Sequence, residues 1–302
     1  MCKLFIREPL RPRSMTLLKI LVLAIVQGAA ELLPVSSSAH VIVAEKLMGL
    51  DPTSPEMTLL LVMLHTGTMF AVILFFWNAW KERFFSSRKV FRDAIKLIAA
   101  ATFLTAIVGL FLKHVIEVFI LRDVPHAEIE LIFGNLILIS ASLAAAGVLI
   151  IFAGWKTRYL RHGNTTLGLK ETCWIGAVQG ICLPFRGFSR SGATISTGLL
   201  FGIAKIRAEE FSFALAVVLT PPVIVREVLR LVKSHHASPL NGVSIAGLFL
   251  PSLLGMSLSF ISGLLALRWL SNWLERGRWH LFGVYCICAS VTVFVLHTAG
   301  LL

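Results

Sequence analysis

The first place to look for chemistry is a set of polar side chains inside an otherwise apolar stretch, residues 16–48. Gln27 and Glu31 stand four residues apart, so both lie on one face if the stretch is helical. An acid inside an apolar segment is costly and is usually functional. Glu31 is therefore a candidate general base or ligand of a divalent cation, with Gln27 beside it. The alternative is a protonated Glu31 that bonds to a neighbouring helix.

Three serines and a histidine follow in the same stretch, at Ser36, Ser37, Ser38 and His40. The serines precede a predicted short helix at 39–48, where at least one is expected to cap free backbone N–H groups. The same helix N-terminus could bind a phosphate, with one serine as the nucleophile. A serine needs an adjacent base, and His40 and Glu31 are available. A packed, satisfied His40 is the alternative.

A second polar group interrupts the apolar segment 172–203. It contains Arg186, Ser189, Arg190, Ser191 and Thr194, next to two glycines. Glycine allows close backbone approach, hydroxyls donate hydrogen bonds, and the fork of Arg190 matches phosphate oxygens. These residues have the composition of a phosphate-binding loop. Snorkelling to the membrane interface is the alternative for Arg186.

Other polar residues give weaker signals. His65 and Thr68 lie in an apolar run and are interpreted as packing or supporting groups. The five cysteines form no CxxC pair and are interpreted as small membrane residues. There is no P-loop, no HExxH zinc motif and no nucleophile elbow.

The elements that must position these groups are membrane helices. Of 302 residues, 57% are hydrophobic and 15% charged, well below the roughly 25% charged residues of soluble domains. About 20 consecutive apolar residues suffice to cross a bilayer. Six runs meet that condition, and we expect spans at about 58–78, 94–113, 129–153, 209–232, 243–267 and 281–301.

Charge sets the expected orientation. The loops 79–93, 154–170 and 268–280 are rich in Lys and Arg, which predicts that they face the cytoplasm. The net charge of +12 therefore indicates contact with anionic membrane lipids, not nucleic acid, for which there is no motif. The basic tail 1–14 conflicts with this orientation. Met15 as the start, a tail that disobeys the rule, or a signal peptide would each account for it.

The two broken segments, 16–48 and 172–203, resemble each other. Val26-Gln27-Gly28 recurs as Val178-Gln179-Gly180, and the Leu-Pro pair at 33–34 recurs at 183–184. Broken helices at membrane depth are tolerated where they line a cavity or are buried in protein. We expect an all-α integral membrane protein with one domain at 15–302. It would comprise two inverted repeats, about 15–153 and 170–302, each a re-entrant hairpin plus three spans.

The motifs also resemble a known family. Residues 24–40 read Ala-Ile-Val-Gln-Gly-Ala-Ala-Glu-Leu-Leu-Pro-Val-Ser-Ser-Ser-Ala-His, and residues 187–194 read Gly-Phe-Ser-Arg-Ser-Gly-Ala-Thr. Both strings resemble motifs of the BacA-type undecaprenyl-diphosphatase family and occur in the order expected for that family. The pattern of spans is also similar to the family's from about residue 15 to the end. Two departures stand out: Gln27 replaces a Glu, and Arg186 replaces the Pro before the glycine.

The resemblance implies hydrolysis of undecaprenyl diphosphate to undecaprenyl phosphate in the bacterial inner membrane, with bacitracin resistance as a consequence. It implies a divalent cation, Mg²⁺ or Ca²⁺, held by Glu31 and Gln27. Ser37 would be the nucleophile and His40 would assist proton transfer. Arg190, with Ser36, Ser189, Ser191 and Thr194, would hold the diphosphate. Water or His40 as the nucleophile, and a homodimer, stay open.

A transporter or flippase of the same lipid is the competing interpretation, because inverted repeats with broken helices are typical of transporters. Such a carrier could bind a lipid phosphate with Arg190 and Glu31 without cleaving it. A purely structural membrane protein would leave both charges unexplained.

Overall fold

The described part of the chain is built mainly from helices. A computed structural model describes residues 16–50, 55–122, 129–157, 163–164, 166–237 and 245–301. The basic tail 1–14 lies outside these residues. The helices are α1 (Leu17–Leu32), α2 (Ser37–Met48), α3 (Pro55–Phe84), α4 (Arg88–Val115), η1 (Ile116–Ile120), η2 (Ile129–Ile132), α5 (Leu136–Thr157), α6 (Leu169–Cys182), α7 (Arg190–Leu200), α8 (Lys205–Ala237), α9 (Ile245–Glu275) and α10 (Trp279–Thr298).

Six of these helices are long and apolar enough to cross a membrane, namely α3, α4, α5, α8, α9 and α10. Each overlaps one of the six spans expected from the sequence, and no described residue lies in a β-strand. The predicted all-α membrane fold is therefore confirmed.

The start of the third span was predicted too early, since α5 begins at Leu136 rather than near residue 129. The physical reason is a cap. Asn135 Oδ1 accepts the backbone N–H groups of Ile137 at 3.0 Å and Leu138 at 3.1 Å. An asparagine that satisfies free N–H groups in this way fixes the start of a helix. The apolar residues before it form the short helix η2 instead.

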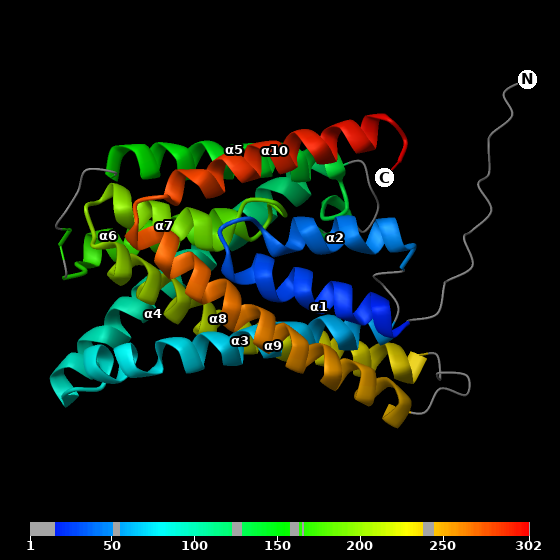
Figure 1. Ribbon diagram of the computed structural model, residues 1–302, viewed down its shortest axis with the longest axis horizontal. Coiled ribbons are helices and arrows are strands. Elements are labelled where there is room, and N and C mark those ends of the chain that lie inside the picture. The colour runs from blue at the N-terminus through cyan, green and yellow to red at the C-terminus, as the bar shows by residue number, and fades with distance from the viewer. Residues whose placement is uncertain are drawn as a thin grey trace, which may run out of the picture.

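The two broken segments form hairpins of short helices. With a rise of about 1.5 Å per residue, α1 (16 residues) and α2 (12 residues) are roughly 24 and 18 Å long. Both are shorter than the roughly 30 Å hydrocarbon core of a bilayer. In Figure 1, α1 and α2 lie to the right of the centre, α6 and α7 lie to the left, and the turns of the two hairpins meet between them.

Proline explains where the first hairpin breaks. Pro34 disfavours helical backbone at the residue before it, and Leu33 is extended, with φ −77° and ψ 154°. Helix α2 then starts at Ser37, two residues earlier than predicted. Ser36 occupies the N-cap position but its side chain makes no capping bond, so the expected serine cap is wrong for this hairpin. A serine cap does exist in the second hairpin, at Ser189.

The glycine of each repeated Val-Gln-Gly triplet lies at a close helix contact. Helix α1 packs on α9, and a Cβ on Gly28 would stand 2.6 Å from Ser259 O. Helix α6 packs on α4, and a Cβ on Gly180 would stand 2.9 Å from Thr105 O. Both glycines therefore allow close packing of two helices, one pair in each half. The inverted arrangement of the halves stays a prediction.

Candidate functional site

Glu31 is the centre of a polar cluster that joins the two hairpins. Ser37 Oγ donates to Glu31 Oε2 at 2.5 Å, and Gln27 Nε2 donates to the same oxygen at 3.2 Å. From the second hairpin, Arg190 Nη2 donates to Glu31 Oε1 at 2.9 Å. Four residues that the sequence singled out in two distant segments are thus joined through Glu31.

Local structure explains how each side chain reaches the cluster. Gln27 and Glu31 are one turn apart near the end of α1, while Ser37 is the first residue of α2 and Arg190 the first residue of α7. The N-termini of α2 and α7 therefore both face Glu31. Helix N-termini carry unpaired N–H groups and partial positive charge. Their convergence, next to an arginine, favours binding of a phosphate.

His65, which the sequence indicated as a packing or supporting group, belongs to the cluster. Its Nε2 lies 3.9 Å from Glu31 Oε2, and its Nδ1 donates to Leu61 O at 2.8 Å. Since a carbonyl oxygen only accepts, Nδ1 carries a proton, and in the neutral ring Nε2 presents a lone pair toward the site. The available signal was an ionisable residue within a span, which is rarely accidental. Thr68 donates to His65 O within α3.

His40 forms hydrogen bonds through both ring nitrogens. Its Nδ1 donates to Ser36 O at 2.7 Å, and its Nε2 pairs with the hydroxyl of Tyr285 on α10 at 2.8 Å. One ring nitrogen therefore binds the turn before α2, and the other binds α10. Proton transfer by His40 stays a prediction, and in this geometry Glu31 is the group that contacts the Ser37 hydroxyl. Ser36 Oγ lies 3.3 Å from Ser38 Oγ.

The hydroxyls of the second hairpin hold its own turn and join it to the first. Ser189 Oγ accepts the N–H of Gly192 at 3.2 Å, and Ser191 Oγ donates to Leu33 O at 3.2 Å. Thr194 is fully buried, and its Oγ1 donates to Arg190 O at 2.8 Å and lies 2.6 Å from Ser212 Oγ. Phosphate binding by these hydroxyls stays a prediction.

Arg186 stacks on an aromatic ring of the segment before α5. Its guanidinium lies over the ring of Phe133, 4.4 Å from the centroid, in a cation–π contact. This contact fastens the turn of the second hairpin to the segment before α5. The arginine at this departure from the family pattern therefore has a packing partner.

The charges at the site remain within reach of a ligand. The side chains of Glu31 and Arg190 are 18% and 21% exposed. Among the side chains that the structure describes, Arg190 Nη1 is a buried donor with no hydrogen-bond partner. A buried donor left unpaired costs roughly 1–3 kcal/mol. A phosphate oxygen bound beside Glu31 would remove that penalty.

The donors around Glu31 allow a test of the expected cation. In the described part of the chain no three His, Cys, Asp or Glu side chains gather as a metal site. One carboxylate, from Glu31, stands with the amide of Gln27 and the imidazole of His65. Mg²⁺ is commonly held by one or two carboxylates together with substrate phosphates. These residues fit a cation shared with a phosphate substrate, not a site made by protein alone.

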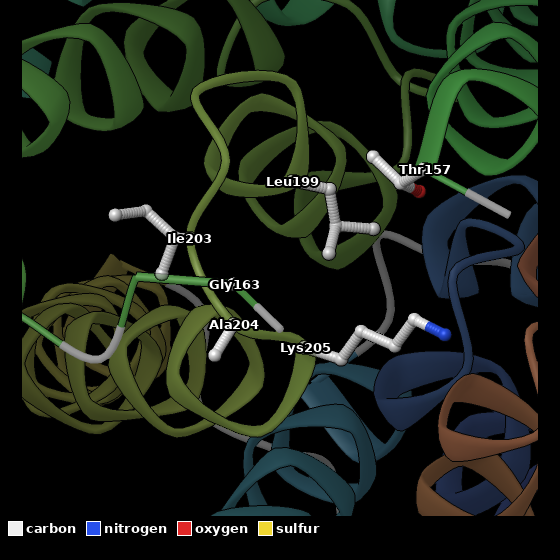
Figure 2. Close-up of a pocket in the computed structure, with 6 residues that line it drawn as sticks. All are labelled: Thr157, Gly163, Leu199, Ile203, Ala204 and Lys205. Carbon is white, nitrogen blue, oxygen red and sulfur yellow. The ribbon is translucent and has the colours of Figure 1, made fainter. Parts of the chain in front are cut away.

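A small cavity lies elsewhere and does not belong to the cluster. Figure 2 shows it lined by Leu199, Ile203 and Lys205, with Thr157, Gly163 and Ala204. Its volume of about 20 Å³ is room for about one water. Leu199 is at the end of α7 opposite to Arg190, so this cavity is too small and too remote to hold a diphosphate.

The chain is similar to known proteins over most of its length. The family model described as "Bacitracin resistance protein BacA" matches residues 20–292, which include every residue of the cluster. The chain is 54% identical to "Undecaprenyl-diphosphatase 2" of Acinetobacter baylyi, over 94% of this chain and 99% of the relative. It is 31% identical to an undecaprenyl-diphosphatase of Desulforapulum autotrophicum (88% and 92% covered) and 30% identical to one of Rhodopirellula baltica (93% and 98%).

Proposed function

This chain belongs to the BacA family, and we propose that it is a membrane phosphatase that hydrolyses undecaprenyl diphosphate to undecaprenyl phosphate and inorganic phosphate. Relatives of nearly equal length carry that activity in their names. The observation that carries the proposal is the contact of Ser37 Oγ with a carboxylate that also binds Arg190. Such a group combines a nucleophile, a base and an anion-binding fork.

The proposed reaction begins with binding. The terminal phosphate is held by Arg190 Nη1 and by free N–H groups at the N-termini of α2 and α7. Donors fixed in place before the reaction stabilise the charge that develops on the transferring phosphoryl group. The polyprenyl tail stays in the lipid beside the apolar spans.

Glu31 is proposed as the base. In one route Ser37 Oγ attacks the terminal phosphorus, its proton passes to Glu31 Oε2, and the bond to the bridging oxygen breaks to release undecaprenyl phosphate. Water then cleaves the phosphoserine, and the serine regains a proton. In the other route Glu31 takes the proton of a water that attacks phosphorus directly. Gln27 and Arg190 hold the carboxylate in place in both routes.

A divalent cation, Mg²⁺ or Ca²⁺, is proposed as the cofactor. Glu31 and the amide oxygen of Gln27 would hold it, with the diphosphate oxygens as further ligands. When bound, such an ion neutralises charge on the phosphates and polarises the phosphoryl group. His65 lies close enough to Glu31 to orient that carboxylate.

Activity of this kind accounts for the family description. Bacitracin sequesters the diphosphate, so a protein that converts it to the monophosphate confers resistance and recycles the carrier for peptidoglycan synthesis. We propose the bacterial inner membrane as its location, since the substrate is a membrane lipid and six helices can span a bilayer.

The test is release of inorganic phosphate from undecaprenyl diphosphate by the purified protein in detergent. We expect release that EDTA abolishes and that added Mg²⁺ or Ca²⁺ restores, and that is lost in Glu31→Ala and Arg190→Ala. The matched control is Arg276→Ala, a change in an exposed arginine after α9. If folded wild-type protein releases no phosphate with any of these cations, the phosphatase proposal fails. Lipid transport would then be the better interpretation.

A further inference from the structure

The turn before the candidate nucleophile has an unfavourable backbone. Ser36 has φ 67° and ψ 95°, and among the described residues it is the single non-glycine with a positive φ. A sparsely populated backbone conformation costs about 1–3 kcal/mol and persists only where surrounding contacts impose it. Ser37 is the next residue. The conformation of Ser36 therefore sets the direction from which Ser37 Oγ meets Glu31.

His40 supplies one of the contacts that impose this conformation. Its Nδ1–H donates to Ser36 O at 2.7 Å. In the neutral ring Nε2 is then an acceptor, so the Tyr285 hydroxyl donates to it at 2.8 Å. The two rings also stack, with centroids 5.6 Å apart and planes 14° from parallel. The Ser36 carbonyl thus fixes the tautomer of His40, and Tyr285 fixes the position of its ring.

Helix α10 contacts the same turn a second time. Cys286 Sγ donates to Pro34 O at 3.3 Å, and Tyr285 acts on Ser36 O through His40. These two adjacent residues of α10 therefore hold the backbone before and after Val35. The helix is itself fixed to α5, where Ser290 Oγ donates to Ser140 O at 2.6 Å. A rigid support of this kind can stabilise a strained turn.

From these contacts we propose that Tyr285 is a positioning residue of the phosphatase, acting through His40 and Ser36 on the orientation of Ser37. The inference rests on the proposed function, which it extends to the last span of the chain. Misplacement of a reacting group by about 1 Å can cost about 100-fold in rate. Loss of one hydrogen bond from this series would relax the turn without removing any group that touches substrate.

The first experiment compares two hydroxyl deletions in α10. Tyr285→Phe removes the hydroxyl that bonds to His40, whereas Thr292→Val removes one that bonds only within α10, to Cys288 O at 2.9 Å. For Tyr285→Phe we expect kcat to fall about tenfold with KM within about twofold, a rate change that corresponds to about 1.4 kcal/mol. Thr292→Val should leave both constants unchanged. Equal kcat for Tyr285→Phe and wild type would overturn the inference.

A second comparison shows whether Tyr285 acts through His40. We expect Tyr285→Phe to have no further effect on kcat in a His40→Ala background, because coupled residues are non-additive. A further severalfold loss in the double variant would mean that Tyr285 acts by another route and would contradict the proposal.

Hydrogen exchange measures the turn without reference to activity. Peptides that cover residues 33–42 should exchange faster in Tyr285→Phe than in wild type, and those that cover 183–192 should not change. If wild-type protein releases no phosphate, the proposed function fails, while the exchange result still decides whether Tyr285 holds the turn. Unchanged exchange at 33–42 would show that it does not.

Discussion

The two hairpins place the same residue types at matching positions but give them different partners. Gln27 and Gln179 belong to the same repeated triplet. Four residues later stands Glu31 in the first hairpin and Leu183 in the second. Gln27 Nε2 accordingly donates to the acid within its own helix, whereas Gln179 Nε2 donates to Thr105 on α4 at 3.1 Å.

The serines differ in the same way. Ser37 and Ser189 each stand ten residues after their glutamine. Ser37 Oγ donates to Glu31, but Ser189 Oγ accepts the N–H of Gly192 and caps α7. In the proposed mechanism one hairpin transfers the proton, and the other supplies Arg190 and a stable scaffold. The two hairpins differ because Glu31 is an acid and the matching residue, Leu183, is not.

The largest effect is expected from that acid. Glu31→Gln keeps the shape and removes the base, and loss of general-base catalysis should lower kcat by about 10²–10⁴-fold. Leu183→Gln makes the matching change in the second hairpin at a side chain that is 49% exposed, and should leave kcat within about twofold. Initial rates of phosphate release measure both. An active Glu31→Gln would remove the acid from the mechanism.

The serines provide the next contrast. Ser37→Ala should lower kcat at least about 100-fold if the hydroxyl is the nucleophile. Ser189→Ala loses a helix cap and should cost about 1 kcal/mol of stability, with a fall in activity of less than about tenfold. Phosphate release and thermal unfolding separate the two outcomes. A Ser37→Ala variant with near wild-type kcat would leave water as the nucleophile.

Arg190 tests the contribution of the second hairpin. Arg190→Lys keeps the charge but loses the planar fork and the unpaired Nη1 donor, so kcat/KM should fall about 100-fold. Arg276→Lys, at an exposed position after α9, is the control and should behave as wild type. If lysine at position 190 supports full activity, positive charge alone is sufficient and the planar fork is not required.

Local features of the sequence predicted the fold well, because an apolar run determines a span and a proline interrupts a helix at its own position. All six spans and both hairpin breaks follow from such features. The errors are also local: Asn135 moved the start of α5, and α2 began at Ser37. Capping contacts of this kind differ by only about 1 kcal/mol between neighbouring positions, so a sequence pattern does not resolve them.

The site was predictable as a set of residue types but not as a geometry. Gln27 and Glu31 are joined by helical spacing, which a sequence shows directly. The contact of Glu31 with Arg190 spans 159 positions and depends on how the hairpins pack. Tyr285 was missed, and His65 was given only a packing or supporting role, because an isolated phenol or imidazole in an apolar run also suits ordinary packing.

The smallest effect separates the two glutamines. Gln27→Ala removes a donor from the Glu31 carboxylate, and the less well oriented base should lower kcat about tenfold. Gln27 and Gln179 are both buried, so each alanine variant should lose about 1–3 kcal/mol of stability, but Gln179→Ala should leave kcat unchanged. Turnover should therefore separate the two variants, whereas thermal unfolding should not. Equal kcat in the two variants would mean that the hairpins do not divide catalysis and support between them as their hydrogen bonds indicate.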